Sequence, residues 1–377
     1  MKKNKLIYIA NLRLPTERAH SIQIMKMCEA FVSQGVEVEL VIPDKRNNLG
    51  ESEVFEYYGI KNFFKIKRIL STDLLGKTRF FGKLFYWIDL LTFLLGLYWT
   101  VKIEGESIIY SRDPILFLPF LGREKCPMWA EIHDIPNHQL FFFRLLRRVA
   151  GVVVITKHLK NILVEMGLGE NKIMVAPDAV DIEGFDINVY QKKIRQKLNI
   201  PLDRKVVMYT GLFDEWKGYR TLLDASLITS SEVQVVMMGG TPEQVNHLKK
   251  KYPKVIFLGF RPYNELAENQ RAADILVVPN SDKVMISKYF TSPLKLFAYM
   301  TSGVPIIASD LPSLREIVDE LMVFFFIPDD PGSLANIINY VLNSPSDAKN
   351  KAGEALIKVK QYSWQNRAKK VLEFIHV

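Results

Sequence analysis

Residues 292–309, SPLKLFAYMTSGVPIIAS, are the stretch that decides the fold. Pro293 is typical of a first helical position, Gly303 of the residue just past a helix end, and residues 304–308 of a buried strand. The stretch therefore predicts a short helix that leads through a tight turn into a sheet strand, with the start of the helix at the carboxyl edge of that sheet.

The same stretch predicts an anion-binding site. The first N–H groups of the helix, which within residues 293–295 belong to Leu294 and Lys295, have no partner within the helix and would point outward at the sheet edge. A cation in the first turn opposes the helix dipole, so Lys295 is best explained by an anion beside it. An ordinary solvated lysine is the alternative.

Strand and helix patterns alternate along the rest of the chain, as in a parallel sheet with helical crossovers. We expect strands at residues 6–10, 36–42, 107–111, 128–133, 151–155, 172–176, 205–210, 233–238, 255–258, 275–278, 304–308 and 322–327. A chain of 377 residues with 48% hydrophobic content is too long for one ordinary core. The pattern breaks at residues 178–189, so the sequence predicts two doubly wound α/β domains, residues 1–185 and 186–360, whose ligand loops face a shared cleft.

Composition narrows the class of protein. The formal charge of +9 implies an anionic partner. Cys28 and Cys126 lie far apart and outside any CxxC or Cys/His cluster, so neither a disulfide framework nor a zinc site is indicated, and a reducing cytoplasm fits. The basic start precedes an apolar run too short for a signal peptide.

Residues 61–101 combine basic, aromatic and apolar character. Seven Lys and Arg interleave with four Phe over residues 61–83, against the single acid Asp73. Without any nucleic-acid module signature, this favours an anionic lipid surface, although a solvated charged face is the alternative. The following apolar run, residues 84–101, is interrupted by Asp89 and Gly96. A transmembrane, an interfacial and a buried helix all remain open for it.

Glycine and lysine follow the strands of the second domain. Gly211 ends the strand at residues 205–210 and would let a ligand approach the backbone, and Lys217 supplies a charge that a diphosphate needs. Two further strands end in Gly239 and in the pair Phe260 and Arg261, where a nucleoside could stack and hydrogen-bond. Plain turn residues are the alternative for each.

Polar residues follow two strands of the first domain. His133 and Asp134 close the strand at residues 128–133, and Arg112 follows the strand at residues 107–111. A polar cluster after an apolar strand favours a functional histidine, so His133 is the catalytic candidate of this domain. Neither a Ser/His/Asp order nor metal-ligand spacing stands out, and we expect no metal.

Long segments resemble the retaining glycosyltransferases of family 4, which have the two-domain GT-B fold. The similarity is carried by PTERAHSIQIMKMCEAF, VVVITKHLKNIL, KIMVAPDAVDIEGFD, TGLFDEWKGYRTLLDA, VIFLGFRPYNELAENQRAADILVVPN, SPLKLFAYMTSGVPIIASDLPSLREIV and YSWQNRAKKVLEFI. The resemblance implies that the C-terminal domain holds a nucleotide-diphosphate sugar and the N-terminal domain the acceptor. It also implies that the last helix, about residues 361–377, packs back on the first domain.

The resemblance assigns roles to individual residues. It implies that Lys217 holds the diphosphate, that amides near Leu294 and Lys295 cap it, and that His133 lies beside the transferred sugar. The family commonly has a Glu, seven residues, then a second Glu that holds the ribose. Those positions are Phe290 and Ala298 here.

The candidate sites are accordingly as follows. The catalytic residues would be His133 and Lys217. The donor would contact Gly211, Lys217, Gly239, Phe260, Arg261, Pro293, Leu294, Lys295 and Ala298. The acceptor would contact Thr16 and His20, from the loop that replaces the family's glycine-rich loop, together with Arg112 and Asp134.

The activity implied is transfer of a sugar, with retention, from a UDP- or GDP-sugar to a lipid-linked glycan or polysaccharide precursor of the cell envelope. We expect neither metal nor cofactor nor nucleic acid, and a peripheral place at the cytoplasmic face of the membrane. A catalytically impaired GT-B scaffold subunit and a nucleotide-sugar epimerase are the alternatives.

Overall fold

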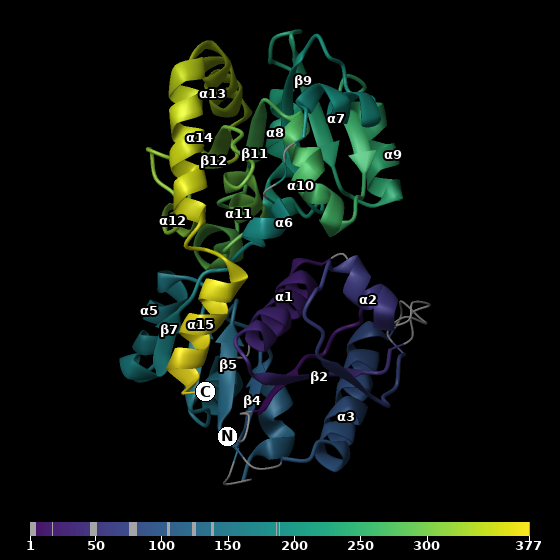
Figure 1. Cartoon of the computed structure of the whole chain (residues 1–377), viewed down its shortest axis with the longest axis vertical. Coiled ribbons are helices and arrows are strands. Elements are labelled where there is room, and N and C mark those ends of the chain that lie inside the picture. The colour runs from purple at the N-terminus through teal and green to yellow at the C-terminus, as the bar shows by residue number, and fades with distance from the viewer. Residues whose placement is uncertain are drawn as a thin grey trace. The chain divides into compact units, whose positions relative to one another are not determined.

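The computed structural model describes residues 5–16, 18–45, 51–74, 81–103, 106–122, 126–136, 139–185, 187 and 189–376. The chain divides into two compact units, Met1–Pro177 with Trp364–Val377, and Asp178–Ser363 (Figure 1). The division at 177/178 differs from the expected 185/186. The reason is that Val180 pairs with Ser363 and Phe185 belongs to the core of the second unit.

The first unit contains a seven-stranded parallel sheet in the order β3-β2-β1-β4-β5-β6-β7. Its strands are β1 (Lys5–Ile9), β2 (Glu37–Pro43), β3 (Lys65–Ile69), β4 (Ser107–Ser111), β5 (Met128–Ile132), β6 (Gly151–Val154) and β7 (Ile173–Val175). Its helices are α1 (Ala19–Ser33), α2 (Glu51–Tyr57), α3 (Gly82–Thr100), α4 (Gln139–Leu146), α5 (Lys157–Glu165) and α15 (Trp364–Ile375), with 3₁₀ turns at Pro114–Phe120 and Glu170–Lys172. The C-terminal α15 lies against α1 (Figure 1).

The second unit contains a six-stranded parallel sheet in the order β10-β9-β8-β11-β12-β13. Its strands are β8 (Lys205–Thr210), β9 (Val233–Met238), β10 (Ile256–Gly259), β11 (Ile275–Val278), β12 (Ile306–Ser309) and β13 (Phe324–Phe326). Its helices are α6 (Ile182–Phe185), α7 (Gln191–Lys197), α8 (Tyr219–Ala225), α9 (Pro242–Lys251), α10 (Leu266–Asn269), α11 (Leu294–Met300), α12 (Pro312–Arg315), α13 (Pro331–Asn343) and α14 (Pro345–Val359). Short 3₁₀ turns at Glu215–Lys217, Tyr263–Glu265 and Gln270–Ala272 and a π turn at Ile286–Phe290 complete it.

Alternate residues of the central strand β8 enter different cores. Val206 and Met208 belong to one hydrophobic cluster, and Val207 and Tyr209 belong to another. Since successive strand side chains point to opposite faces, both faces of the sheet are covered. The strand order places β8 in the middle, with the order reversing on either side, which is the doubly wound arrangement. The predicted fold of two doubly wound sheets is confirmed.

Strand β3 was not expected from the sequence. Residues 61–83 read as a basic, aromatic surface segment, yet Ile66 and Ile69 are buried while Lys65 is exposed and pairs with Glu39. Lysine alternating with isoleucine is a pattern that suits an edge strand, because charges there discourage pairing with other chains. Of the basic residues in this segment, Lys77 and Arg79 lie outside the described residues.

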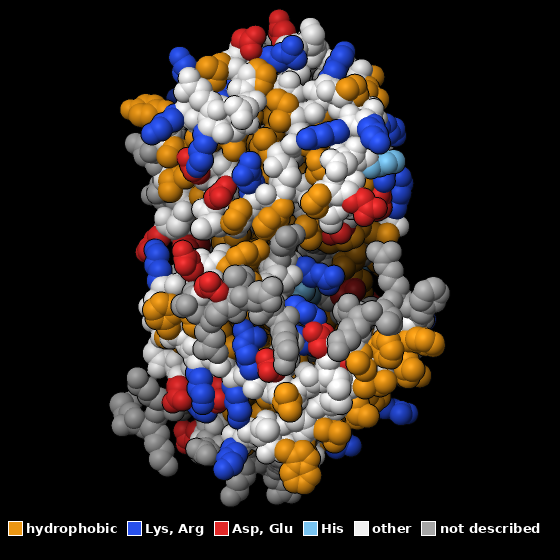
Figure 2. All heavy atoms as spheres, turned by 90° about the vertical axis from the view of Figure 1, so that its right-hand side faces the viewer, with side chains coloured by type: hydrophobic (Ala, Val, Ile, Leu, Met, Phe, Trp, Pro, Cys, Tyr) orange, Lys and Arg blue, Asp and Glu red, His pale blue; other side chains and the backbone are white. Residues whose placement is uncertain are grey.

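Helix α3 is one-sided rather than wholly buried. Leu90, Phe93 and Leu97 face the core, whereas Leu84, Trp87, Leu91, Leu95, Tyr98 and Trp99 are 49–77% exposed. Figure 2 shows hydrophobic side chains gathered at the lower right of that view, on the first unit. Among the described residues, no helix is both long and apolar enough to cross a membrane. The sequence left three alternatives open for the apolar run at residues 84–101. Two of them, a spanning helix and a fully buried helix, are therefore wrong.

Candidate functional site

Three glycines lie side by side at the carboxyl edge of the second sheet. Gly211, Gly239 and Gly259 end the neighbouring strands β8, β9 and β10, and each has a positive φ, of 137°, 125° and 69°. The N–H of Gly239 donates to the carbonyl oxygen of Gly259 at 2.8 Å. A Cβ at position 239 would lie 2.0 Å from the carbonyl oxygen of Gly211. Close backbone packing thus requires glycine at position 239, and leaves a stretch of bare main chain at this edge.

The Lys295 ammonium lies directly beside this glycine row. A Cβ at position 211 would lie 3.4 Å from the Nζ of Lys295, and Nζ stands 3.9 Å from the centre of the Tyr209 ring. Nζ is enclosed by protein and has no hydrogen-bond partner in the part of the chain that the structure describes. Burial, and then the charge of Lys217, hold the pKa of Lys295 well below its ordinary value.

Lys217 is the second cation of this edge. It belongs to the 3₁₀ turn Glu215–Lys217, which Gly218 follows. Gly218 has a φ of 64°, and a Cβ there would lie 1.8 Å from the carbonyl oxygen of Pro279, so this position requires glycine. Its ammonium pairs with Asp214 at 2.8 Å and lies 5.1 Å from the Trp216 ring. Two lysines therefore share one charge partner, the half-exposed Asp214.

The structure corrects one expectation for α11. Pro293 is the N-cap and not the first helical residue, and the helix spans only the seven residues Leu294–Met300. So short a helix sums few peptide dipoles, and the case for an anion here rests on Lys217 and Lys295 instead. Ala298 is 2% exposed and lies in the hydrophobic core, and its expected contact with a ribose stays a prediction. Phe290 is also buried.

Phe260 and Arg261 follow β10 and are both exposed, and Leu294 is half-buried. The place of these three residues in a donor site stays a prediction.

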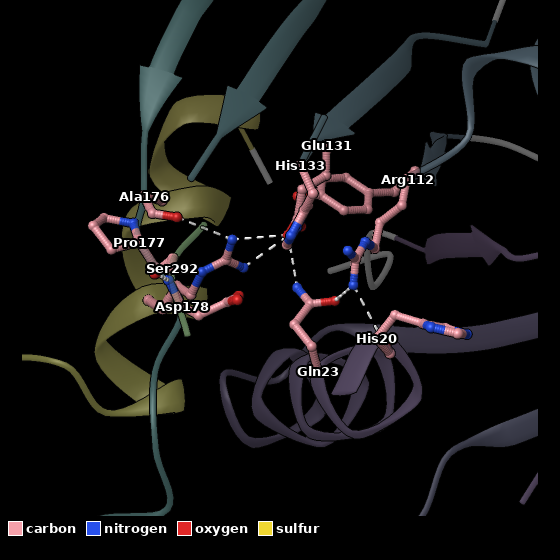
Figure 3. A network of polar contacts seen from close by, with 11 residues as sticks. His20, Gln23, Arg112, Glu131, His133, Ala176, Pro177, Asp178 and Ser292 are labelled. Atoms are coloured by element: carbon pink, nitrogen blue, oxygen red, sulfur yellow. Dashed lines mark hydrogen bonds and ion pairs between the residues drawn. The ribbon is translucent and has the colours of Figure 1, made fainter. Parts of the chain in front are cut away.

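In the first unit, His133 belongs to a hydrogen-bonded network around a buried carboxylate (Figure 3). The Nε2 of His133 lies 2.7 Å from an oxygen of Glu131, which is fully buried, while the His133 side chain is 16% exposed. Burial and the charge of Arg112 lower the pKa of His133 to about 3. The imidazole is therefore neutral at physiological pH, and this contact is a hydrogen bond rather than an ion pair.

Gln23 joins this network to a second predicted residue. Its amide nitrogen donates to Glu131 at 2.7 Å, and its amide oxygen accepts from the Arg112 guanidinium at 3.0 Å (Figure 3). The Arg112 guanidinium also donates to the carbonyl oxygen of His20 at 3.5 Å. Burial, and the charges of Arg112 and Arg18, lower the pKa of His20 to about 4. The structure thus brings His20, Arg112 and His133 together.

The two remaining acceptor candidates are placed differently. Thr16 is held by its backbone, whose N–H donates to the Tyr58 hydroxyl at 2.7 Å and whose carbonyl accepts from it at 3.0 Å. Asp134 is exposed, and its carboxylate accepts from the N–H of Ile135 at 2.8 Å. Among the described residues, neither Thr16 nor Asp134 hydrogen-bonds to the His133 network, so their contact with an acceptor stays a prediction.

Neither unit, taken by itself, brings three metal-ligating side chains together among its described residues. That the reaction needs no metal stays a prediction.

A segment of the second unit is similar in sequence to a known protein family. Residues 204–344 match the model of glycosyl transferases group 1. Residues 204–344 therefore resemble the group 1 glycosyltransferases. Among curated relatives, an uncharacterized glycosyltransferase of Methanocaldococcus jannaschii is 25% identical over 59% of this chain and 58% of its own length. The D-inositol 3-phosphate glycosyltransferase of Corynebacterium urealyticum is 25% identical over 59% of this chain and 56% of its own. The matches thus span a little over half the length of these relatives.

Similarity to solved structures extends over the whole length of the chain. HepE of Anabaena, in complex with UDP and glucose, has a TM-score of 0.76 at 16% identity and covers 99% of both chains. The sucrose-phosphate synthase of Thermosynechococcus elongatus has a TM-score of 0.79 at 18% identity, covering 99% of this chain and 98% of its own. At such identities the likeness concerns the fold, and the predicted GT-B fold is confirmed.

Sequence reasoning missed the residues that hold the candidates in place. Glu131, Tyr110 and Arg367 meet across 21 and 236 positions of sequence, which no local pattern records. A signal did exist for Glu131: a carboxylate in the middle of the apolar strand MWAEI must have buried partners.

Proposed function

We propose that this chain is a glycosyltransferase that transfers a sugar, with retention, from a nucleotide-diphosphate sugar to an acceptor. The enclosed ammonium of Lys295 carries the proposal. A buried lysine without a hydrogen-bond partner is costly to charge, and a diphosphate would add a counter-charge to that of Asp214, which pairs with Lys217. Lys217 lies within electrostatic reach, and the glycine row allows phosphate oxygens to approach the main chain.

The chemistry would consist chiefly of leaving-group stabilisation. As the bond between the sugar and the diphosphate breaks, negative charge develops on the β-phosphate, and two lysines fixed beforehand would stabilise it. His133 would act from the first unit as a neutral hydrogen-bonding group at the transferred sugar. UDP and GDP are both compatible with these contacts.

Nucleotide binding and turnover are separate tests. We expect UDP or GDP, with its sugar, to raise the melting temperature of the second unit, since a ligand of the native state stabilises it. We expect the matching nucleotide-sugar to be consumed with release of the diphosphate, and nuclear magnetic resonance to show an unchanged anomeric configuration in the product. Binding without turnover would favour the catalytically impaired scaffold. Phe290 and Ala298 favour that alternative, because they replace the two Glu that the family commonly has. Interconversion of the donor sugar would favour an epimerase.

We infer further that the acceptor is lipid-linked and that α3 holds the protein at an anionic membrane surface. The exposed face of α3 presents Trp87, Leu91 and Trp99, the residue types that lie at membrane interfaces. The only acid of α3, Asp89, is buried and accepts from Thr72 and Leu74. The exposed Lys83 and Lys102 flank the two ends of the helix, so its charge suits anionic headgroups.

Co-sedimentation with vesicles tests this surface. We expect binding to phosphatidylcholine vesicles only when phosphatidylglycerol is included, and weaker binding at high salt, since each nearby Lys contributes about 1 kcal/mol. Replacing both tryptophans by serine (Trp87→Ser with Trp99→Ser) should release the protein. Tyr190→Ser, at an exposed aromatic of the second unit, should not. Self-association of the wild type, with no vesicle binding, would assign the face to a second copy instead.

A further inference from the structure

Four side chains from four different elements converge on the buried carboxylate of Glu131 in the first unit (Figure 3). Gln23 on α1 and His133 after β5 lie 2.7 Å from one of its oxygens, and Tyr110 on β4 donates to the other at 2.5 Å. Arg367 on α15 donates at 2.8 Å. With the weaker Arg367 contact at 3.5 Å, the carboxylate accepts five hydrogen bonds.

Arg367 fixes the charge of this carboxylate. Its guanidinium is 3% exposed and also donates to the carbonyl oxygens of Ala176 and Pro177. Burial by itself would raise the pKa of Glu131, but the charge of Arg367 and the hydrogen bond from His133 hold it well below its ordinary value. Glu131 is therefore ionised, and an ionised carboxylate only accepts hydrogen bonds.

The ionised carboxylate determines the tautomer of His133. Because Glu131 can only accept, the hydrogen of the neutral imidazole must lie on Nε2. The other ring nitrogen, Nδ1, then carries a lone pair. Among the described residues nothing donates to Nδ1, and the side chain keeps some exposure. His133 is thus presented as a hydrogen-bond acceptor.

We propose that Glu131 is a positioning residue, which holds His133 as the Nε2–H tautomer so that Nδ1 accepts a hydrogen bond from a sugar hydroxyl. The proposal rests on the proposed function, in which His133 meets the transferred sugar. Arg367 contributes indirectly to the orientation of His133, because it keeps Glu131 charged. The C-terminal helix α15 thereby becomes part of the site, and not only of the core.

Nitrogen-15 magnetic resonance of the histidine rings tests the tautomer without any substrate. With six histidines in the chain, the His133 signals are assigned by their loss in His133→Gln. We expect the wild-type ring to show the Nε2–H tautomer and to stay neutral from pH 5.5 to 8, about where an ordinary histidine titrates. An Nδ1–H tautomer, or protonation near the ordinary pKa, would overturn the proposal.

Glu131→Gln and a matched control test the link to turnover. Glu39 is also a buried carboxylate of the first sheet with two basic partners, Lys5 and Lys65, so Glu39→Gln controls for loss of a buried charge. We expect Glu131→Gln to lower kcat by about 10- to 100-fold, the range for groups that orient a functional imidazole, with nucleotide affinity unchanged. The histidine spectrum should show a mixed tautomer in this variant alone.

Three outcomes separate the proposals. Equal losses of kcat in Glu131→Gln and Glu39→Gln, with an unaltered His133 spectrum, would reduce Glu131 to a structural residue. A mixed tautomer with full turnover would also reject the positioning role. If the wild type has the expected tautomer but no transferase activity at all, the proposed function fails while the geometry of His133 stands. Should Glu131→Gln not fold, the wild-type spectrum still decides the tautomer.

Discussion

The Nζ of Lys295 lies 3.9 Å from the centre of the Tyr209 ring and has no hydrogen-bond partner among the described residues. A ring face attracts a desolvated cation by about 2 kcal/mol. That is less than the cost of leaving an ammonium enclosed without a counter-ion. We therefore propose that an anion completes the environment of Lys295 in the second unit.

Replacing Lys295 by methionine should weaken binding of the cognate nucleotide diphosphate by about 1.5 to 3 kcal/mol, the value of a hydrogen bond to a charged group. Methionine keeps the apolar stem over Tyr209 and removes only the ammonium. The control is Lys251→Met, because Lys251 also lies over a ring, that of Tyr252 at 5.0 Å, but is exposed. Calorimetric titration measures both, and equal affinities in the two variants would remove Lys295 from the donor site.

Nucleotide binding should take up a proton at Lys295. The pKa of the unliganded ammonium is held well below its ordinary value by burial and Lys217, and a diphosphate beside it would raise that pKa. Below the unliganded pKa, Lys295 is protonated in both states and affinity does not change with pH. Between the unliganded and liganded pKa values, affinity should fall by up to about tenfold per pH unit as pH rises.

Titration calorimetry in two buffers of different ionisation enthalpy counts the proton. We expect a buffer-dependent heat for the wild type and none for Lys295→Met. A buffer-independent wild-type heat across neutral and alkaline pH would mean that Lys295 keeps the same charge with and without the nucleotide.

Removing the counter-charge of Glu131 should destabilise the first unit strongly. Arg367→Met leaves a buried carboxylate with neutral partners only, which costs about 3 to 5 kcal/mol. For a unit of this size that is a fall of roughly 6 to 20 °C in melting temperature. Arg315→Met is the control, since Arg315 pairs with Asp310 and Glu320 at the surface of the second unit and should cost no more than about 1 kcal/mol. Similar shifts in the two variants by scanning calorimetry would contradict the buried ion pair.

The sequence predicts periodic features such as strands better than contacts between residues that lie far apart in the chain. Both sheets follow from apolar runs such as residues 205–210, and Gly211 and Gly239 could be placed at strand ends because glycine interrupts the pattern there. Strand β3 could not, since its alternating Lys and Ile match a solvated segment as well as an edge strand. The burial of Ala298 in the hydrophobic core was not predicted either, because periodicity fixes which residues share a face of α11 but not which face meets the core.

A glycine of the glycine row and a matched glycine outside it offer the sharpest test of that row. Gly239→Ala brings a Cβ to 2.0 Å from the carbonyl oxygen of Gly211, so the main chain of two strand ends must move. Gly303→Ala meets nothing within 4 Å and carries only the cost of a left-handed backbone, about 1 to 2 kcal/mol. We expect Gly239→Ala to lose more than this in stability and to lose nucleotide binding. Gly303→Ala, which has the same φ of 69° and open space as Gly259 but lies outside the glycine row, should keep its binding. Scanning and titration calorimetry measure the two effects. If Gly239→Ala binds the nucleotide as the wild type does, phosphate oxygens do not approach the main chain at this edge, and the donor must lie elsewhere on the second unit.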